Sequence, residues 1–402
     1  MTLAIGLNSG SSFDGIDVVL IDIPMAADGL PGKPKFILGK SYDWPKAVAD
    51  IVLRAFENEV SLFEFCRLNY LAGAVYAESA RSLMREAGVK QGEVEVIGFD
   101  GQTIYQEPPI HARLRNYDVS EDLVSRWLDG PYGCGLQIGE PAIVAEACET
   151  PTVTQFRTMD HALGGTGAPL MQYLDFVAFR DIGPILTLNI GGIANCQLAH
   201  SDRNQMMAFD TGPGNVMMDH VMRARLNLPY DKNGEVARSG RVDEGMLSEL
   251  KGHDYFKRPI PRSAWRLDFG SSYADGVMAK YAKLSNSDMM ATVTEFSAYA
   301  ITQSIIDNVK RLADISVIMA SGGGTRNAFL MERLAKYMPG TLRLALSDEF
   351  GIPAHFKEAI KFGVLAHATI NGFANNIPAA SGATRFGILG KLVLPPRLAK
   401  GT

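Results

Sequence analysis

The chain has 402 residues and a formal net charge of -5 at pH 7, and 47% of its residues are hydrophobic against 21% charged. This composition is typical of a globular protein of two or three domains, and it argues against nucleic-acid binding, because phosphate backbones are bound by basic patches. No apolar run approaches the ~18 residues that span a bilayer, and the first residues lack the basic start of a secretory signal, so we expect a cytoplasmic protein without a membrane partner.

The first residues predict a β-hairpin with a polar turn. An apolar run at 3–7 precedes the turn at 8–15, and apolar residues then alternate at 16, 18 and 20, which is the pattern of a half-buried strand. A dinucleotide-binding fold requires a helix directly after the glycine turn, and the GxxxxGK[ST] phosphate loop is absent from the sequence. Both of these common nucleotide sites are therefore excluded.

A helix over 61–88 and a strand over 95–99 follow, whereas 105–135 and 376–396 are expected to be connecting or peripheral segments. The run ILTLNIGGIANCQLA at 185–199 then repeats the hairpin design about 180 residues after the first. Its two adjacent glycines leave backbone N–H groups uncovered, which favours an anionic ligand. Long-period similarity of this kind suggests two related domains that face a shared cleft.

The last third of the chain predicts a helix over 291–313, a strand over 315–320, the turn SGGGTRN at 321–327 and a helix from Asn327. A glycine turn between a strand and a helix N-terminus is favourable for nucleotides, because helix N–H groups and the helix dipole attract anions. Two glycine hairpins and a later triple-glycine turn together resemble the superfamily of actin, the heat-shock chaperones and the sugar kinases.

A closer resemblance is carried by nine strings in register. The chain is similar over almost its whole length to the anhydro-N-acetylmuramic acid kinases and the related levoglucosan kinases in the strings GLNSGSSFDGID (6–17), GQT (101–103), LQIGE (136–140), FRTMDHALGGTGAPL (156–170), LNIGGIAN (188–195), FDTGPGN (209–215), YDKNGEVARSGRV (230–242), SGGGTRN (321–327) and DEFGIPAHFKEA (348–359).

The resemblance implies an α/β protein with a two-domain, actin-like ATPase (ribonuclease H-like) fold and a central ATP cleft. We expect an N-terminal domain of 1–135 with 383–402, and a C-terminal domain of 136–382. The implied reaction opens the internal bridge of a 1,6-anhydro sugar by addition of water and phosphorylates O6 at the expense of ATP. The default substrate is 1,6-anhydro-N-acetylmuramic acid, used in cell-wall recycling, and a homodimer is expected.

The resemblance places Asp160 on the family's catalytic base. From the residues alone it would be a turn-forming Asp in a loop of small residues. The chemistry agrees, because opening at an anomeric carbon requires a carboxylate that accepts a proton from water.

By the same resemblance the residues that contact ATP come from the two hairpin turns, the FDTGPGN string and the triple-glycine turn. They are Ser9, Gly10, Ser11, Ser12, Asp14, Asn189, Gly191, Gly192, Asn195, Asp210, Gly212, Gly214, Asn215, Gly322, Gly323, Gly324 and Asn327. Asp14 and Glu358 are the candidates for holding Mg²⁺, although residues of these types are more often turn or solvated helix residues. Asn215 is also a natural helix cap.

The expected sugar contacts are Asp100, Gln102, Thr103, Arg157, Gly165, Gly167 and Arg266. Two of these loops depart from the family, which commonly has His where this chain has Asp100 and Asp where it has Gln155. An aspartate facing an anionic lactyl group would disfavour it, so we predict that a neutral 1,6-anhydro sugar is accepted at least as well as the muramic acid, unless Arg157 and Arg266 offset the charge. Two alternatives are a kinase of a different neutral anhydro sugar or of a hexose, and a non-catalytic ATP-binding protein of the actin or chaperone kind.

Overall fold

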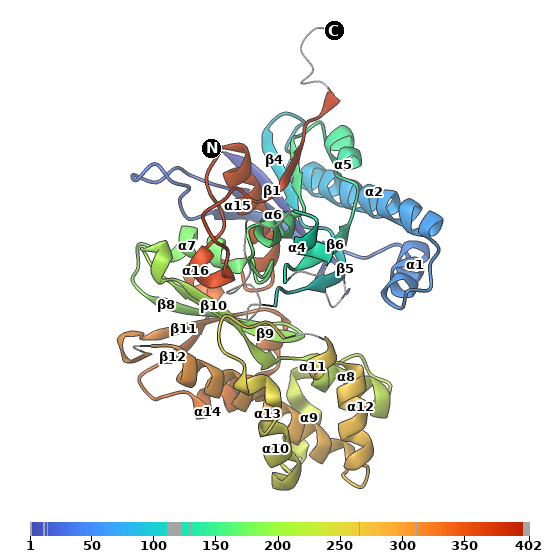
Figure 1. The fold of residues 1–402 in the computed structure, drawn as a ribbon, viewed down its shortest axis with the longest axis vertical. Coiled ribbons are helices and arrows are strands. Elements are labelled where there is room, and N and C mark those ends of the chain that lie inside the picture. The colour runs from blue at the N-terminus through green and yellow to red at the C-terminus, as the bar shows by residue number, and fades with distance from the viewer. Residues whose placement is uncertain are drawn as a thin grey trace. The chain divides into compact units, whose positions relative to one another are not determined.

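The computed structural model describes residues 2–10, 13, 15–110, 123–128, 131–264, 266–310 and 312–396. The chain forms two compact units. The first comprises Met1–Asp181, Ser201–Met206 and Gly351–Thr402, and the second comprises Ile182–His200 and Met207–Phe350. Figure 1 shows the elements of both.

The first unit is built on a six-stranded sheet of order β13-β7-β4-β1-β2-β3. The strands β1, β2 and β3 are antiparallel neighbours, whereas β4 is parallel to β1 and β7 is parallel to β4. The bounds are β1 (Leu3–Asn8), β2 (Ile16–Asp22), β3 (Lys35–Tyr42), β4 (Val94–Phe99), β7 (Thr152–Thr154) and β13 (Lys391–Val393). The predicted hairpin is confirmed, because Leu3 pairs with Asp22 and Asn8 with Asp17.

The second unit repeats this arrangement in a five-stranded sheet of order β10-β9-β8-β11-β12. Its first three strands are antiparallel and its last two are parallel to β8 and to each other. The bounds are β8 (Ile185–Ile190), β9 (Ile193–Ala199), β10 (Met207–Pro213), β11 (Val317–Ser321) and β12 (Arg343–Leu346). The second predicted hairpin, the two related domains and the α/β class are therefore confirmed.

These units divide the chain differently from the expected domains. Residues 136–181 and 351–382, assigned from sequence to the C-terminal domain, belong to the first unit. The reason is strand pairing and helix packing: β7 pairs with β4, and α15 (Lys357–Ile370) packs on β1 and β4. Asp160, on α6 (Phe156–Ala162), accordingly lies in the first unit.

In the first unit α15 and α2 (Leu62–Ala87) pack on the sheet, and in the second α13 (Asn286–Asn308) packs on β9 and β10. The helices of the first unit are α1 (Lys46–Phe56), α2, α4 (Ser125–Leu128), α5 (Pro141–Cys148), α6, α7 (Met171–Phe179), α15, α16 (Pro378–Ser381) and the 3-10 helix η1 (Arg203–Gln205). In the second they are α8 (Val216–Leu226), η2 (Lys232–Gly234), α9 (Glu235–Ser239), α10 (Glu244–Lys251), η3 (Asp254–Lys257), α11 (Arg266–Phe269), α12 (Ser271–Lys280), α13, η4 (Leu312–Asp314), η5 (Gly323–Arg326), α14 (Ala328–Tyr337) and η6 (Ser347–Phe350).

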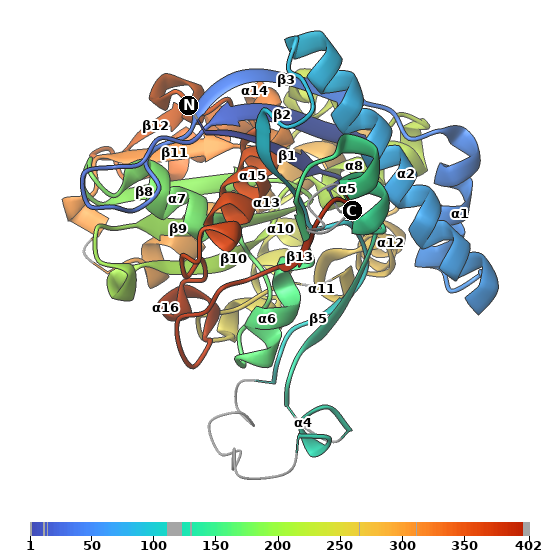
Figure 2. The same ribbon diagram turned by 90° about the horizontal axis from the view of Figure 1, so that it is seen from above.

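The predicted helices at 61–88 and 291–313 are present, with α13 shifted toward the N-terminus because Ser285 caps it by accepting from Asp288 N. The two ends of the expected connecting or peripheral segment 105–135 lie in strands: β5 (Gln102–Glu107) and β6 (Cys134–Ile138) form an antiparallel pair, beyond which α4 projects (Figure 2). No helix in the described part of the chain is long and apolar enough to cross a membrane.

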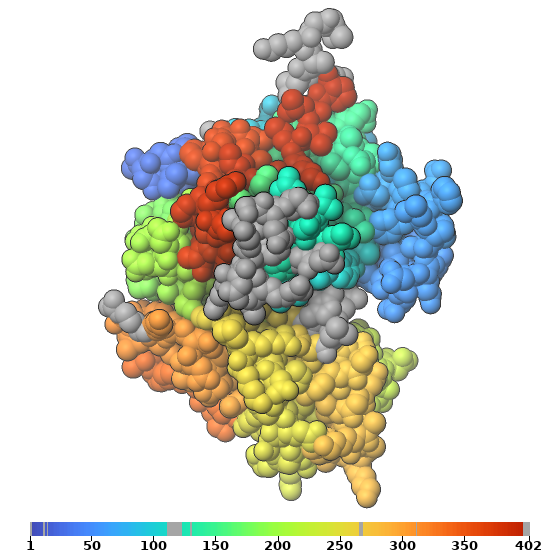
Figure 3. All heavy atoms as spheres, in the orientation of Figure 1, coloured from blue at the N-terminus to red at the C-terminus, as the bar shows by residue number. Residues whose placement is uncertain are grey.

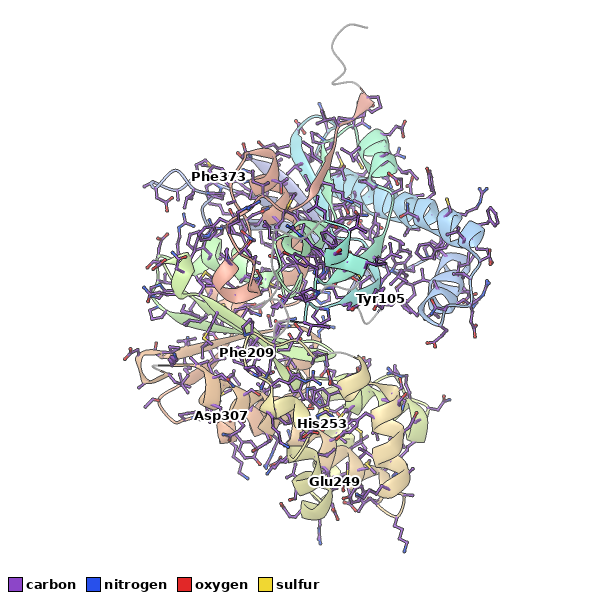
Figure 4. All side chains as sticks on the ribbon, in the orientation of Figure 1. Tyr105, Phe209, Glu249, His253, Asp307 and Phe373 are labelled. Atoms are coloured by element: carbon purple, nitrogen blue, oxygen red, sulfur yellow. The ribbon has the colours of Figure 1, made fainter. Side chains whose placement is uncertain are left out.

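The core of the second unit surrounds α13, which packs against β10 and carries a nearly continuous buried surface. Phe209 of β10 is buried in this core, and His253 lies 4.8 Å from the Phe269 ring between ring centres; both side chains are labelled in Figure 4. The β8–β9 hairpin packs on this core.

In the first unit α15 packs directly against the sheet at two glycines. Ile5 and Leu7 of β1 pack in one cluster with α2, and Gly6 between them faces α15, because successive strand residues point to opposite faces. A Cβ atom at Gly6 would overlap Ala359 O, and one at Gly98 of β4 would overlap Phe362 O. The helix backbone therefore rests directly on the two strands.

We expect Gly98→Ala to destabilise the protein by about 1–3 kcal/mol, because the new methyl group meets helix backbone that cannot move aside. Thermal and urea unfolding measure this loss. The matched control is Gly276→Ala in α12, where an added Cβ has no atom within 4 Å and where alanine favours a helix by up to ~1 kcal/mol. Equal stability of the two variants would contradict the packing argument.

Candidate functional site

Asp160 is a buried carboxylate whose oxygens are held by backbone and side-chain donors. Its side chain is 1% exposed; Oδ2 accepts from Gly167 N at 2.8 Å and Oδ1 from Ser381 Oγ at 2.9 Å. Burial raises the pKa of Asp160, and these hydrogen bonds oppose the rise. A carboxylate with a raised pKa is a stronger base, and here its orientation is fixed.

The loop 163–167 is shaped around this carboxylate by two glycines. A Cβ at Gly165 would overlap the Asp160 carboxylate, and Gly167 has φ +65° with no room beside the His161 ring. The two expected sugar-site glycines therefore hold Asp160 and His161 in place. His161 Nε2 lies 3.0 Å from Gln106 Nε2 and Nδ1 lies 3.3 Å from Gly165 O; burial lowers the pKa of His161 to about 4, so the ring is neutral at pH 7.

The segment 374–387, most of which falls in the stretch 376–396 expected to be connecting or peripheral, lies against Asp160 and supplies the Ser381 side chain to it. Ser381 donates to Oδ1, and the buried side chain of Asn376 lowers the pKa of the carboxyl group. Figure 3 shows this part of the chain in red on the surface of the first unit. These residues could not be predicted from sequence, because a short string such as NNIPAASG has no helical or strand period.

Asp100 does not present a free charge to a ligand. It is 3% exposed; Oδ2 accepts from Arg157 Nε at 2.5 Å and Oδ1 from Phe156 N at 3.1 Å. Arg157 Nη1 also donates to Gly167 O at 2.9 Å. The ion pair thus joins the end of β4 to α6, and the predicted repulsion of an anionic sugar loses its basis because Arg157 balances the charge.

The first glycine turn is pinned by a buried polar group. Ser9 Oγ donates to Gln102 Oε1 at 2.6 Å and accepts from Trp44 Nε1 at 3.1 Å, and Gln102 Nε2 donates to Gly10 O at 3.5 Å. Gln102, expected to contact sugar, is buried here and holds the turn. Thr103 follows it in β5. The predicted residues Ser11, Ser12 and Asp14 lie outside the described residues.

Glu358 lies on the first turn of α15, and its Oε2 accepts from Asn8 Nδ2 at 3.2 Å. One helical turn later Lys361, which the sequence analysis did not single out, is buried with its ammonium 4.2 Å from the centre of the Phe362 ring. Burial lowers the pKa of Lys361, and Glu358 opposes that shift. The end of β1 and the start of α15 therefore place a carboxylate and an ammonium group near the first turn.

The second glycine turn is held by backbone hydrogen bonds on one side and borders open space on the other. The carbonyls of Gly191 and Gly192 accept from Asn215 N at 2.8 Å and Gly214 N at 2.9 Å. A Cβ at Gly192 would meet no atom nearer than 3.9 Å, and one at Gly191 none nearer than 3.4 Å. Space thus remains where a ligand could approach the backbone. A Cβ at Gly214 would overlap Gly191 O, so this glycine supports the turn.

Polar residues beside this turn have structural partners. Asn195 Oδ1 accepts from Gln197 Nε2 at 2.6 Å. Asn215 occupies the cap position of α8 without a side-chain cap, its Nδ2 donating instead to Ile190 O at 3.5 Å. Gly212 has φ +139° and packs against α13 at Ala300. Their side chains shape the turn.

Asp210 Oδ2 accepts from Ala264 N at 2.8 Å, and burial raises the pKa of Asp210 to about 7. The carboxylate holds the loop that precedes α11, whose first residue is Arg266; the side chain of Arg266 lies outside what the structure describes.

The three glycines of the triple-glycine turn have different surroundings. Gly322 has φ +86°, with an added Cβ 2.6 Å from Asn189 Oδ1, and a Cβ at Gly324 would overlap the Ile190 side chain. At Gly323 an added Cβ would have no atom within 4 Å. Asn327 Oδ1 accepts from Leu330 N at 3.0 Å and caps α14. Gly323 alone of the three borders open space, while Gly322, Gly324 and Asn327 have structural roles.

No three His, Cys, Asp or Glu side chains gather into a metal cluster in the described part of the chain. A Mg²⁺ ion bound with nucleotide phosphates usually takes only one or two protein carboxylates, the phosphates and water supplying the rest. Glu358 beside Asn8 is a fitting oxygen donor of this kind.

The family model and the curated relatives agree on one family. A family model described as anhydro-N-acetylmuramic acid kinase matches residues 2–118 and 121–395. The anhydro-N-acetylmuramic acid kinase of Caldanaerobacter subterraneus subsp. tengcongensis is 34% identical over 400 residues, covering 98% of this chain and 97% of that relative. The protein of the same name from Clostridioides difficile is 34% identical over 397 residues, covering 98% of each chain. A solved activator of the 2-hydroxyisocaproyl-CoA dehydratase from Clostridium difficile with bound ADPNP aligns at a TM-score of 0.43 and 10% identity, covering 92% of this chain and 96% of that one.

We expect Gly323→Val to fold with nearly unchanged stability while nucleotide affinity falls about tenfold or more, because the side chain enters open space beside the turn. Gly324→Val should instead lower the melting temperature, since its side chain overlaps Ile190. Calorimetric titration with an ATP analogue and thermal unfolding separate the two effects. Unchanged affinity in a folded Gly323→Val protein would remove this turn from the nucleotide site.

Proposed function

The chain belongs to the anhydro-N-acetylmuramic acid kinase family and is an ATP-dependent sugar kinase of the actin-like fold, and on this premise we propose that it hydrolytically opens 1,6-anhydro-N-acetylmuramic acid and phosphorylates its O6. The acceptor is proposed from the names of the relatives. The observation that carries the mechanism is the buried, oriented carboxylate of Asp160.

In this mechanism Asp160 accepts a proton from a water molecule as the water oxygen bonds to C1 of the sugar. The C1–O6 bond breaks, and O6 bonds to the γ-phosphorus of ATP as ADP leaves. The products are the sugar 6-phosphate and ADP. The hydrogen bonds from Gly167 N and Ser381 Oγ fix the acceptor oxygens before the reaction, so little reorganisation is required when charge moves.

We assign the phosphates of ATP to the first and second glycine turns, and the adenosine to the triple-glycine turn. Support comes from the open approach at Gly191, Gly192 and Gly323. Glu358 would hold Mg²⁺, which when bound would neutralise charge on the transferred phosphoryl group. Lys361, one turn along α15, adds a positive charge on the same helix. We also propose that the protein is a cytoplasmic homodimer, as the family resemblance implies.

The Asp100–Arg157 ion pair bears on whether the acceptor is the anionic muramic acid or a neutral anhydro sugar. Because Arg157 balances Asp100, the site has no net negative charge there that would disfavour the lactyl carboxylate. Steady-state kinetics with ATP, Mg²⁺ and a panel of 1,6-anhydro sugars and hexoses test this. We expect kcat/KM for the muramic acid to exceed that for a neutral anhydro sugar; a clear preference for the neutral sugar or for a hexose would overturn the substrate assignment.

Replacing Asp160 with Asn keeps the size of the side chain and removes the base, so we expect kcat to fall by roughly 10²-fold or more with ATP affinity nearly unchanged. The control Asp181→Asn alters an exposed aspartate just beyond α7 and should leave kcat at the wild-type level. Retention of most activity by Asp160→Asn would exclude the base role.

The raised pKa of Asp160 also sets a pH dependence. A general base must be deprotonated, so kcat is full above that pKa and falls as pH decreases through it. Because burial raises the pKa, we expect the fall to occur above pH 3.8, the ordinary value of an aspartate. A kcat that stays constant down to that pH in a folded enzyme would contradict the assignment.

A further inference from the structure

Arg203 is an arginine that the reaction scheme above does not use. It lies in η1, between β9 and β10 of the second sheet, yet this short loop belongs to the first unit. Its Nη2 donates to Ala374 O at 2.8 Å and to Asn376 O at 2.5 Å. One guanidinium nitrogen thereby clamps two carbonyls of the segment that runs from α15 to α16.

Aromatic rings hold the guanidinium group in place. Its central carbon lies 4.5 Å from the centre of the Phe386 ring, 5.4 Å from that of Phe176 and 5.7 Å from that of Tyr173. Phe386 lies in the loop before β13, and the other two rings lie on α7. Arg203 thus contacts both α7 and the loop before β13.

No carboxylate forms an ion pair with Arg203 among the residues that the structure describes, and burial lowers the pKa of its guanidinium group. A partly buried cation without a countercharge is costly, and carbonyl dipoles and ring faces offset that cost here. Arg203 is therefore committed to a fixed geometry at 374–376.

The clamped backbone carries the side chains that hold Asp160. The side chain of Asn376 lowers the pKa of the Asp160 carboxyl group; its Nδ2 donates to Arg385 O at 3.0 Å and its Oδ1 accepts from Gly387 N at 2.8 Å. Ser381, five residues later, donates to Asp160 Oδ1. A shift of the backbone at 376 would move the first of these donors directly.

We propose that Arg203 is a positioning residue for Asp160, acting through the backbone of 374–376 and the side chain of Asn376. This inference rests on the proposed base role of Asp160. Along the chain, the loop that carries Arg203 follows β9, the strand that begins directly after the Gly191–Gly192 turn.

The test compares Arg203→Ala with Arg180→Ala as a matched control. Arg180 is likewise a buried arginine over the Phe176 ring, 5.1 Å from its centre, but it binds Asp28, Pro31 O and Val177 O and has no contact with 374–387 among the described hydrogen bonds. Both variants lose stability. Only Arg203→Ala is expected to lower kcat, by about tenfold, with the KM for ATP within about twofold of wild type.

The pH dependence distinguishes positioning from destabilisation. The Asn376 side chain lowers the pKa of Asp160, so its loss or displacement raises that pKa, and the acid limb of kcat moves to higher pH in Arg203→Ala and in Asn376→Ala. Arg157 and His161, the charged and titratable neighbours on α6, stay in place in each variant. Since Arg203 acts through Asn376, the double variant should shift the limb no further than Asn376→Ala alone.

Arg203→Lys, which can still donate to a carbonyl, should restore part of the activity, and it serves as the test protein if Arg203→Ala does not fold.

A second measurement does not depend on turnover. With aspartate labelled by ¹³C at the carboxyl carbon, the Asp160 signal is identified by its absence in Asp160→Asn, and its titration is followed in each variant. If Asp160→Asn remains active, the base role fails, yet the signal still reports whether Arg203 positions Asp160. A titration that is unchanged in Arg203→Ala, or shifts that add in the double variant, would overturn the inference.

Discussion

The close approach of α15 to the first sheet is the contact on which the rest of the site depends. Gly6 and Gly98 leave no side chain between β1, β4 and the helix backbone, so α15 has a fixed height and direction. Its first turn then places Glu358 against Asn8 at the end of β1. Beyond its last turn, Asn375 Nδ2 donates back to Leu365 O at 2.9 Å, which directs the following residues toward Asp160. One helix therefore connects the proposed metal ligand with the support of the proposed base.

Asp160 illustrates how burial and hydrogen bonding are balanced in such a site. Full desolvation alone would favour the protonated acid, which cannot accept a proton, whereas strong donors alone would make the carboxylate a weak base. Here burial raises the pKa, and donors from the glycine loop and from 376–381 limit the rise. Most of these donors come from segments without regular structure, and each is anchored in turn, Asn376 by Gly387 N and Arg385 O.

The sequence was most informative where a pattern repeats. Both hairpins, the glycine turns, α2 and α13 were predicted, because strand alternation, helical spacing and paired glycines are local signals. The unit boundaries were not, since β7 joins the first sheet by pairing with β4 and α15 joins it by packing on β1 and β4, which lie hundreds of residues earlier in the chain. The ion pair of Asp100 could not be derived from local sequence either, because its partner Arg157 is 57 residues away. The same holds for Ser381, 221 residues from Asp160.

In the proposed mechanism, a water molecule activated at Asp160 opens the anhydro bridge while O6 accepts the phosphoryl group. The most direct measurement is a turnover in H₂¹⁸O with mass spectrometry of the products, taken before the anomeric oxygen exchanges with solvent and compared with finished product kept in H₂¹⁸O for the same time. The account predicts one ¹⁸O atom at C1 of the sugar 6-phosphate and none in its phosphoryl group. A product without ¹⁸O at C1, or label found in inorganic phosphate, would contradict it.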